Sequence, residues 1–197
     1  MLIDKSYFTG KINIPNLEQD TVNPDLITNN NSFDRLIKEY SFKYLVDVFG
    51  FKVANEILDE VEPDGTVKAS AEQKYKDLIN GVDKWRGLRY EVQGVKYSQI
   101  AYYVYCQWVY ENQTQLTDIG NTIDNAEKAN VVNSWNKFND AWREMHLLRE
   151  PEHFYSVQNY YFRNKQDIYT LYDYISESSD WVTNDFISYE NTNSFGL

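Results

Sequence analysis

Reactive and metal-binding side chains are scarce in this sequence, which has one cysteine and two histidines among 197 residues. A single thiol excludes an internal disulfide framework, and Cys106 stands in an apolar and aromatic run that suits a small buried side chain. His146 and His153 are seven residues apart with Pro151 between them, whereas metal ligands on one helix need a spacing of three or four. We therefore expect neither a reactive thiol nor a histidine metal site.

Motifs of nucleotide-binding and hydrolytic sites are missing as well. The sequence has no GxxxxGKS or GxxxxGKT phosphate loop, no GxGxxG turn and no GxSxG nucleophile elbow. The acidic residues between positions 56 and 64 lack the alternating ligands and terminal Glu of a Ca²⁺ loop, so a solvated helix end and turn is the favoured interpretation. The sequence predicts no catalytic, cofactor-binding or metal-binding residues, and hence no enzyme.

Long apolar runs are absent. No uncharged apolar stretch approaches the roughly 20 residues that a membrane-spanning helix needs. The first residues, Met1 to Lys5, lack the basic and apolar regions of a signal peptide. We expect an intracellular protein, or one assembled inside a cell, without membrane contact.

Basic residues are outnumbered, since 19 Lys and Arg stand against 30 Asp and Glu and give a net charge of -11. Binding of nucleic acid through its phosphates needs clustered cations, so tight binding to DNA is not expected. An acidic surface is nevertheless compatible with a channel wall, because repulsion keeps a passing duplex mobile.

Aromatic residues are abundant, at 16% of the chain with 17 Tyr and 5 Trp. A tyrosine joins a large apolar ring to a polar tip, which suits surfaces buried against other subunits as well as a core. Codon bias in an AT-rich genome is an equally weighted alternative for the surplus of Tyr.

The pattern of apolar residues predicts a mainly α protein, an irregular helical bundle with extended N- and C-terminal arms. The N-terminal arm covers residues 1–31, the helical bundle domain 32–176 and the C-terminal arm 177–197. Alternation at 11–14 indicates a short strand in the first arm. The apolar residues of this arm are too many for a solvated tail, so we expect it to dock on its own body or on a neighbour.

In the first half of the bundle, a helix is predicted after the N-cap Ser32, and Gly50 ends or kinks it. A further helical segment over 51–61 leads into a turn at 62–65. A capping-box pattern formed by Ser70 and Gln73 predicts a short helix to about Asn80, which Gly81 closes. The glycine-bounded stretch 85–94 alternates apolar and polar residues and predicts a short strand or extended connection.

In the second half, residues 95–115 predict a helix that is apolar almost all round and therefore central. A long polar loop is expected at 116–130, and helices at 126–149 and 154–176. Five apolar residues give the first of these helices its spacing of 4, 3, 4 and 3: Val131, Trp135, Phe138, Trp142 and Met145. Such a stripe is more typical of a core or helix-partner surface than of a ligand-stacking platform.

The order of these elements resembles the head-tail connector, or head-completion, proteins of tailed bacteriophages and of prophages of gut bacteria, crAss-like phages included. The matching stretches are LIDKSYFTGKI at 2–12, the helix from Ile37 to LVDVFG at 45–50, YKDLING at 75–81, YYVY at 102–105, the loop at 115–122 and YTLYDYI at 169–175. They cover most of residues 1–176. The polar insertion after Val22 and the tail after Ser176 depart from the family pattern, which leaves the roles of both ends open.

The resemblance implies a structural protein of the virion, located in the neck or tail region and assembled in the cytoplasm of the bacterial host. Such proteins form a homo-oligomeric ring, typically a dodecamer, below the portal protein. They join the portal to the tail or to further neck proteins and line the DNA exit channel without sequence-specific binding. No catalytic residue is carried over. Residues 1–31, 116–130 and 177–197 are expected to make inter-subunit or portal contacts.

Two other interpretations remain. The first is an intracellular helical adaptor unrelated to virions, which binds another protein and forms a monomer or dimer with an exposed groove. The second is an enzyme with a cryptic carboxylate or metal site, which binding of a divalent ion near residues 56–64 would indicate.

Overall fold

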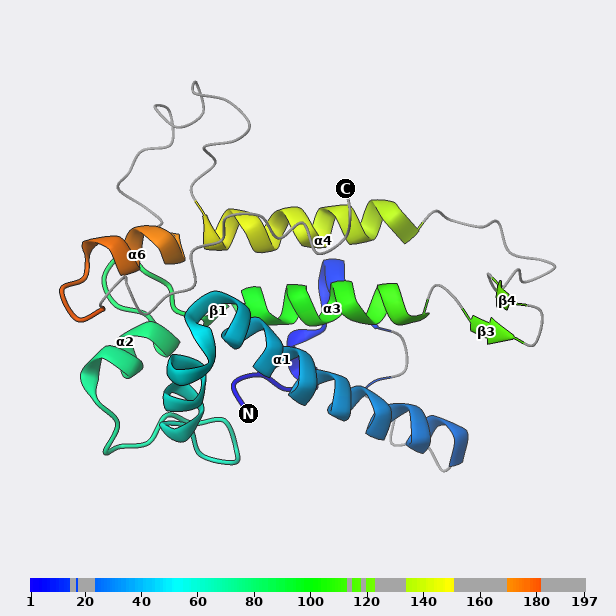
Figure 1. Cartoon of the computed structure of the whole chain (residues 1–197), viewed down its shortest axis with the longest axis horizontal. Coiled ribbons are helices and arrows are strands. Elements are labelled where there is room, and N and C mark those ends of the chain that lie inside the picture. The colour runs from blue at the N-terminus through cyan, green and yellow to red at the C-terminus, as the bar shows by residue number, and fades with distance from the viewer. Residues whose placement is uncertain are drawn as a thin grey trace, which may run out of the picture.

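The protein is mainly α-helical, as its sequence predicts (Figure 1). The structure, a computed structural model, describes residues 1–14, 17, 24–112, 115–117, 120–122, 134–150 and 170–181, with backbone alone for 24–32, 112, 115–117, 120–122 and 134. The helices are η1 (Lys5–Tyr7), η2 (Gly10–Ile12), α1 (Pro24–Asp59), α2 (Gln73–Asn80), α3 (Gln99–Asn112), α4 (Ser134–Arg149) and α6 (Leu171–Glu177). The strands are β1 (Arg89–Val92), β2 (Val95–Ser98), β3 (Gln115–Thr117) and β4 (Gly120–Thr122), paired as two antiparallel hairpins.

The long helix α1 begins at Pro24, which lies inside the segment 1–31 that the sequence predicts to be extended. A proline suits the first turn of a helix because its missing N–H would be unpaired there in any case. Because α1 already includes Ser32, the prediction that Ser32 is the N-cap is wrong. The predicted kink at Gly50 is confirmed by its backbone angles, φ 79° and ψ 161°. Glycine adopts this conformation without steric cost, and the second half of α1 turns away from the first (Figure 1).

Helix α3 packs against both α1 and α4 and forms the centre of the core. Ile100, Ala101 and Val104 are fully buried, which confirms the prediction of a central apolar helix. Cys106 is buried beside them, and burial raises the pKa of its thiol to about 12. The thiol therefore stays protonated at neutral pH, and the prediction of a small buried side chain at Cys106 is confirmed.

The helix α3 starts at Gln99, four residues later than the sequence predicts. Residues Val95–Ser98 instead form β2, which pairs with the predicted strand at 89–92. Gln93 and Gly94 both have positive φ, 51° and 81°, and close a two-residue turn between the strands. The apolar spacing of 95–98 suits a helix and a strand equally, and the tight turn decides in favour of the strand.

The N-terminal segment docks on the body of its own chain. Leu2, Ile3, Phe8 and Ile12 are buried in the same core as α3, and Phe8 meets Phe33 of α1 edge to face at 4.8 Å. Burial of each such side chain stabilises the fold by roughly 1.5–3 kcal/mol. The expected strand at 11–14 is wrong, because residues 10–12 form the turn η2.

The region between α1 and β1 confirms some of the predicted signals and corrects one. A hydrogen bond from the Gly65 amide to the Glu62 carbonyl closes the predicted turn, and Gly81 ends α2. The capping box is wrong, because α2 is capped by Glu72 without a side-chain hydrogen bond. Gln73 donates instead to Asp77 one turn later in the same helix.

The last elements are described only in part. Residues 115–122, predicted as loop, contain the short hairpin β3–β4, while 123–133 lie outside the described residues. Of the helix predicted at 126–149, the structure describes α4 from Ser134. Of the helix predicted at 154–176 it describes α6, which Thr170 and Asp173 cap reciprocally, and residues 151–169 are outside the described part. The C-terminal arm at 177–197 is described only to Trp181.

A pair of glycine substitutions tests the packing between α2 and β1. An added Cβ at Gly87, where φ is +94°, would lie 2.5 Å from the Ile79 carbonyl oxygen, whereas one at Gly94, φ +81°, meets nothing within 4 Å. Alanine is strained at positive φ in both variants. For Gly94→Ala this strain should lower the free energy of unfolding by about 1 kcal/mol. Gly87→Ala also forces backbone apart and should lower the free energy of unfolding by at least about 3 kcal/mol. Equal losses in urea titrations of the two variants would contradict this account.

Candidate interaction surface

The N-terminal segment, the β1–β2 hairpin and α4 enclose a pair of adjoining hollows, which we call the N-terminal groove. The first hollow, about 210 Å³, lies between residues 1–7, the turn 63–66 and the hairpin. The second, about 300 Å³, lies between residues 9–12, β2 and α4. Tyr7 and Lys96 line both hollows and join them.

Three tyrosines form part of the wall of the N-terminal groove. Tyr7, Tyr97 and Tyr102 line the larger hollow, and Tyr97 stacks on Tyr90 with 5.3 Å between ring centroids. Burial raises the pKa of Tyr102 to about 12 and also raises that of Tyr7, although the Arg89 guanidinium partly offsets the effect at Tyr7. These phenols therefore stay protonated at neutral pH and offer apolar faces and hydroxyl groups for binding.

Two part-buried cations reach the groove without a carboxylate partner among the described residues. A guanidinium nitrogen of Arg89, Nη1, donates to the Leu2 carbonyl at 2.9 Å. The Lys96 ammonium donates to Ser6 Oγ at 2.8 Å and lies 5.4 Å from the centroid of the Tyr7 ring. Neither cation forms an ion pair among the described residues, although Glu91 lies opposite Lys96 in the β1–β2 register.

The acidic residues of the smaller hollow are bound to their own turns. Asp4 accepts a hydrogen bond from the Ser6 amide at 2.7 Å. Asp64 accepts from the amide and hydroxyl of Thr66 at 2.8 and 2.7 Å, and these hydrogen bonds lower its pKa. The carboxylates stabilise the loops that shape the groove.

A second exposed surface lies at the other end of the α3–α4 pair. The two helices run antiparallel, so the end of α3 and the start of α4 lie together, next to the β3–β4 hairpin (Figure 1). Tyr110 is 57% exposed and Trp135 is 46% exposed there, and we call them the distal aromatic pair. Trp135 and Glu144, which lines the N-terminal groove, are nine residues apart and hence about 180° apart around α4. The two surfaces therefore occupy opposite sides of this helix.

The aromatic stripe of α4 divides between core and surface. Phe138 is 5% exposed and Met145 is fully buried, which confirms the core interpretation for this side of the helix. Trp142 stacks on Phe138 at 6.0 Å and contacts the ring of His146 at 5.0 Å. Trp135, near the start of α4, departs from the core interpretation because it is 46% exposed, although its ring meets that of Phe138 edge to face at 5.5 Å. Val131 lies outside the described residues.

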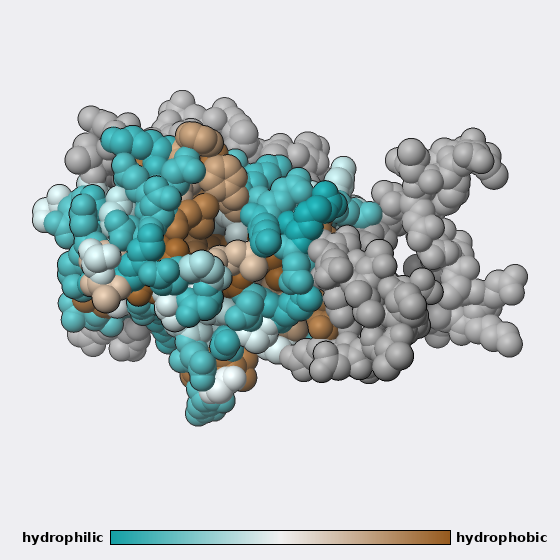
Figure 2. Space-filling view, turned by 90° about the horizontal axis from the view of Figure 1, so that it is seen from below, coloured by the Kyte–Doolittle hydropathy of each residue, from teal (hydrophilic) through white to brown (hydrophobic). Residues whose placement is uncertain are grey.

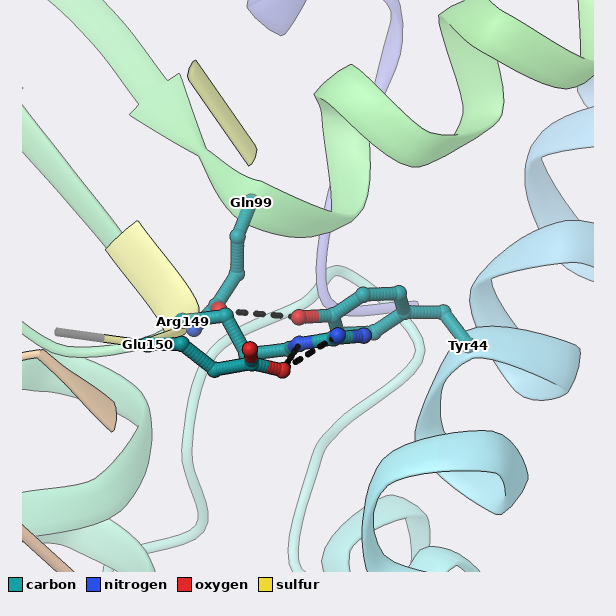
Figure 3. Close-up of polar contacts among 4 residues, drawn as sticks. All are labelled: Tyr44, Gln99, Arg149 and Glu150. Carbon is teal, nitrogen blue, oxygen red and sulfur yellow. Dashed lines mark hydrogen bonds and ion pairs between the residues drawn. The ribbon is translucent and has the colours of Figure 1, made fainter. Parts of the chain in front are cut away.

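A polar layer lies at the start of α3 (Figure 3). The Tyr44 hydroxyl donates to the Gln99 side-chain oxygen at 2.8 Å, and Gln99 is only 1% exposed. Its amide nitrogen finds no acceptor among the described residues. Arg149 pairs with its neighbour Glu150 through Nε at 2.8 Å and through Nη2. These contacts orient the helices from which the side chains come, and none of the four groups is an activated nucleophile.

Acidic and hydrophobic groups elsewhere do not form a recognisable site in the described part of the chain. There, no group of three His, Cys, Asp or Glu side chains is placed to hold a metal ion. In the acidic segment 56–64, Glu56 accepts a hydrogen bond from the Tyr75 hydroxyl at 2.8 Å. Figure 2 shows hydrophobic surface in a hollow bordered by hydrophilic side chains. Within the same described residues, none of the helices combines the length and apolar character that crossing a bilayer requires.

Comparisons of the chain with protein-family models, with curated proteins and with solved structures find no match. The relation to connector proteins therefore stays a prediction from the sequence.

His146 gives the α4 packing a pH signature. Burial lowers its pKa, and Arg149 lowers it further. The unfolded chain then takes up the proton at a higher pH than the folded chain, so the free energy of unfolding falls as the pH drops through the ordinary histidine range. His146→Gln should lose less stability than the wild type between about pH 8 and about pH 5.5 in urea titrations. Titration of carboxylates affects both proteins equally and cancels in the comparison. If the free energies of unfolding of the two proteins changed in parallel with pH, that result would contradict the burial of the His146 imidazole.

Proposed function

We propose that this protein is a ring-forming head-tail connector, a structural protein of a phage neck that joins the portal protein to the tail or to further neck proteins. The observation that carries the proposal is the pair of dissimilar exposed surfaces on opposite sides of α4. One is concave, with Tyr7, Lys96 and Arg89 in its lining, and the other presents Tyr110 and Trp135. The ring would contain about twelve copies, the typical number in the family that the sequence resembles.

Dissimilar surfaces on opposite sides of a subunit support head-to-tail association. A closed ring requires that each copy offers one surface to the neighbour ahead and a different one to the neighbour behind. Tyrosine and tryptophan are the residues most often enriched at such contacts, because each supplies a large area with few rotatable bonds. The short hairpin β3–β4 extends the same end of the α3–α4 pair and adds reach toward a neighbour (Figure 1).

The charge of the chain supports a place beside moving DNA. With a net charge of -11, a ring of these subunits would repel the phosphates of a duplex in its lumen. Sequence-specific binding needs basic and polar side chains that reach the base edges, and its affinity comes from phosphate neutralisation. An acidic lumen lets the DNA pass and does not hold it.

An intracellular helical adaptor unrelated to virions is the second candidate, and the N-terminal groove is the observation that favours it. A groove with aromatic walls and unpaired donors is also what a protein-binding module presents to its target. The adaptor differs from the connector in its oligomeric state, since it needs no ring.

The test of the connector is the mass of the assembled chain in native mass spectrometry, with sedimentation velocity at several concentrations. The wild type should form a closed oligomer of uniform size, alone or with a portal protein. Tyr110→Ser combined with Trp135→Ser should raise the subunit concentration needed for assembly by roughly tenfold or more, because interface aromatics commonly contribute at least about 1–2 kcal/mol each.

Phe51→Ser is the matched control for this experiment. Phe51 is 66% exposed on α1 and is as large an aromatic surface as either member of the distal aromatic pair. Its replacement should leave assembly unchanged. A monomer or dimer at every concentration, with or without the portal protein, would refute the ring and favour the adaptor.

A further inference from the structure

We propose that the N-terminal groove is a carboxylate-binding site, and that its ligands are acidic side chains of a second copy of this chain. Lys96 is the contacting cation at the junction of the two hollows, and Arg89 reinforces it. This inference rests on the proposed ring, because it names the chemistry of one contact between neighbouring subunits.

Lys96 and Arg89 each have N–H donors that no acceptor among the described residues uses. An ammonium has three N–H donors, and Lys96 uses one on Ser6. A guanidinium has five, and Arg89 contacts Leu2 with one, approaches Asn80 with another at 3.4 Å and also hydrogen-bonds the Tyr7 hydroxyl. Both side chains are part-buried, so water replaces the missing partners less well than at an open surface. A carboxylate would accept the remaining protons in charge-assisted hydrogen bonds, which are about twice as strong as neutral ones.

The acids that line the groove are already engaged within the chain. Asp4 and Asp64 are bound within their own turns. Glu144, at the edge of the larger hollow, pairs with Lys11 at 2.6 Å. Lys5, in the N-terminal segment, pairs with Asp34 at 2.9 Å. Glu91 lies directly opposite Lys96 in the β1–β2 register but forms no ion pair with it among the described residues. Lys96 and Arg89 are therefore cations of the groove that pair with no acid of their own chain, and they are available to an incoming anion.

The size and walls of the groove suit side chains better than a folded partner or a large cofactor. The larger hollow of about 300 Å³ is at the lower end of the usual range for ligand pockets. Tyr7, Tyr97 and Tyr102 would contact the apolar stem of a Glu or Asp while the carboxylate reaches Lys96. One or two acidic side chains fill such a space.

Charge complementarity identifies the second copy as the source. The chain carries 30 acidic against 19 basic residues, so as a whole it offers more carboxylates than cations to a second copy. Equally charged copies repel each other at a distance, and a local cationic site is where close approach becomes favourable. The contact should weaken as salt screens the charges.

Zero-length carbodiimide coupling of an assembled mixture of unlabelled and ¹⁵N-labelled full-length chain tests this proposal. The reagent joins an amine to a carboxylate in direct contact, and mass spectrometry of the digest separates links within a copy from links between copies. We expect peptides that contain Lys96 to be joined to Asp or Glu peptides of the other isotope. Lys96→Gln should remove these links and raise the concentration for assembly roughly tenfold at low salt.

Lys52→Gln is the control for the loss of one positive charge. Lys52 is exposed on α1 and forms no ion pair among the described residues, so this variant should assemble like the wild type. Rings in which Lys96 links only to acids of its own copy, or to nothing, would overturn the carboxylate site and leave the proposed function standing. A chain that never assembles would refute the ring itself, and this inference with it.

Discussion

Burial of α3 between α1 and α4 is the constraint on which the rest of the structure depends. The helix has apolar or aromatic side chains on nearly every face, and such a helix is stable in water only when neighbours cover it. Helices α1 and α4 cover opposite parts of it, and the N-terminal segment contributes Phe8 and Ile12 to the same core. The antiparallel course of α3 and α4 then places the distal aromatic pair at one end and leaves the N-terminal groove beside β2.

Local signals in the sequence predicted the parts of the fold in which one interaction dominates. Gly50 and Gly81 adopt positive φ, which other residues avoid, so the kink in α1 and the end of α2 could be predicted from the residue type. The central place of α3 followed from its composition. Errors arose where two local signals competed. The segment 95–98 joins a hairpin because of the turn at Gln93 and Gly94, and the expected capping box at Ser70 does not form.

The candidate site lay beyond sequence reasoning because its residues meet only in the folded chain. Tyr7 and Lys96 are 89 positions apart, and Glu144 comes from a third element. Nothing in the sequence around Lys96 distinguishes it from the other lysines. One signal could have indicated the groove. The alternating residues at 89–98 can pair as a hairpin, and the apolar N-terminal segment can pack beside that hairpin. The sequence indicated docking of that segment but not where it would dock.

Excess negative charge has opposite effects on the two parts of the proposed role. Repulsion from phosphates favours free passage of DNA through a ring, and the same repulsion between subunits works against closing that ring. Assembly then requires apolar and aromatic contact that is insensitive to charge, together with a few cations placed where subunits meet. The distal aromatic pair offers the first, and Lys96 and Arg89 offer the second. An acidic chain that closes into a ring would therefore place some of its part-buried cations without an ion pair at the contacts between subunits, and Lys96 and Arg89 in the N-terminal groove are two such cations.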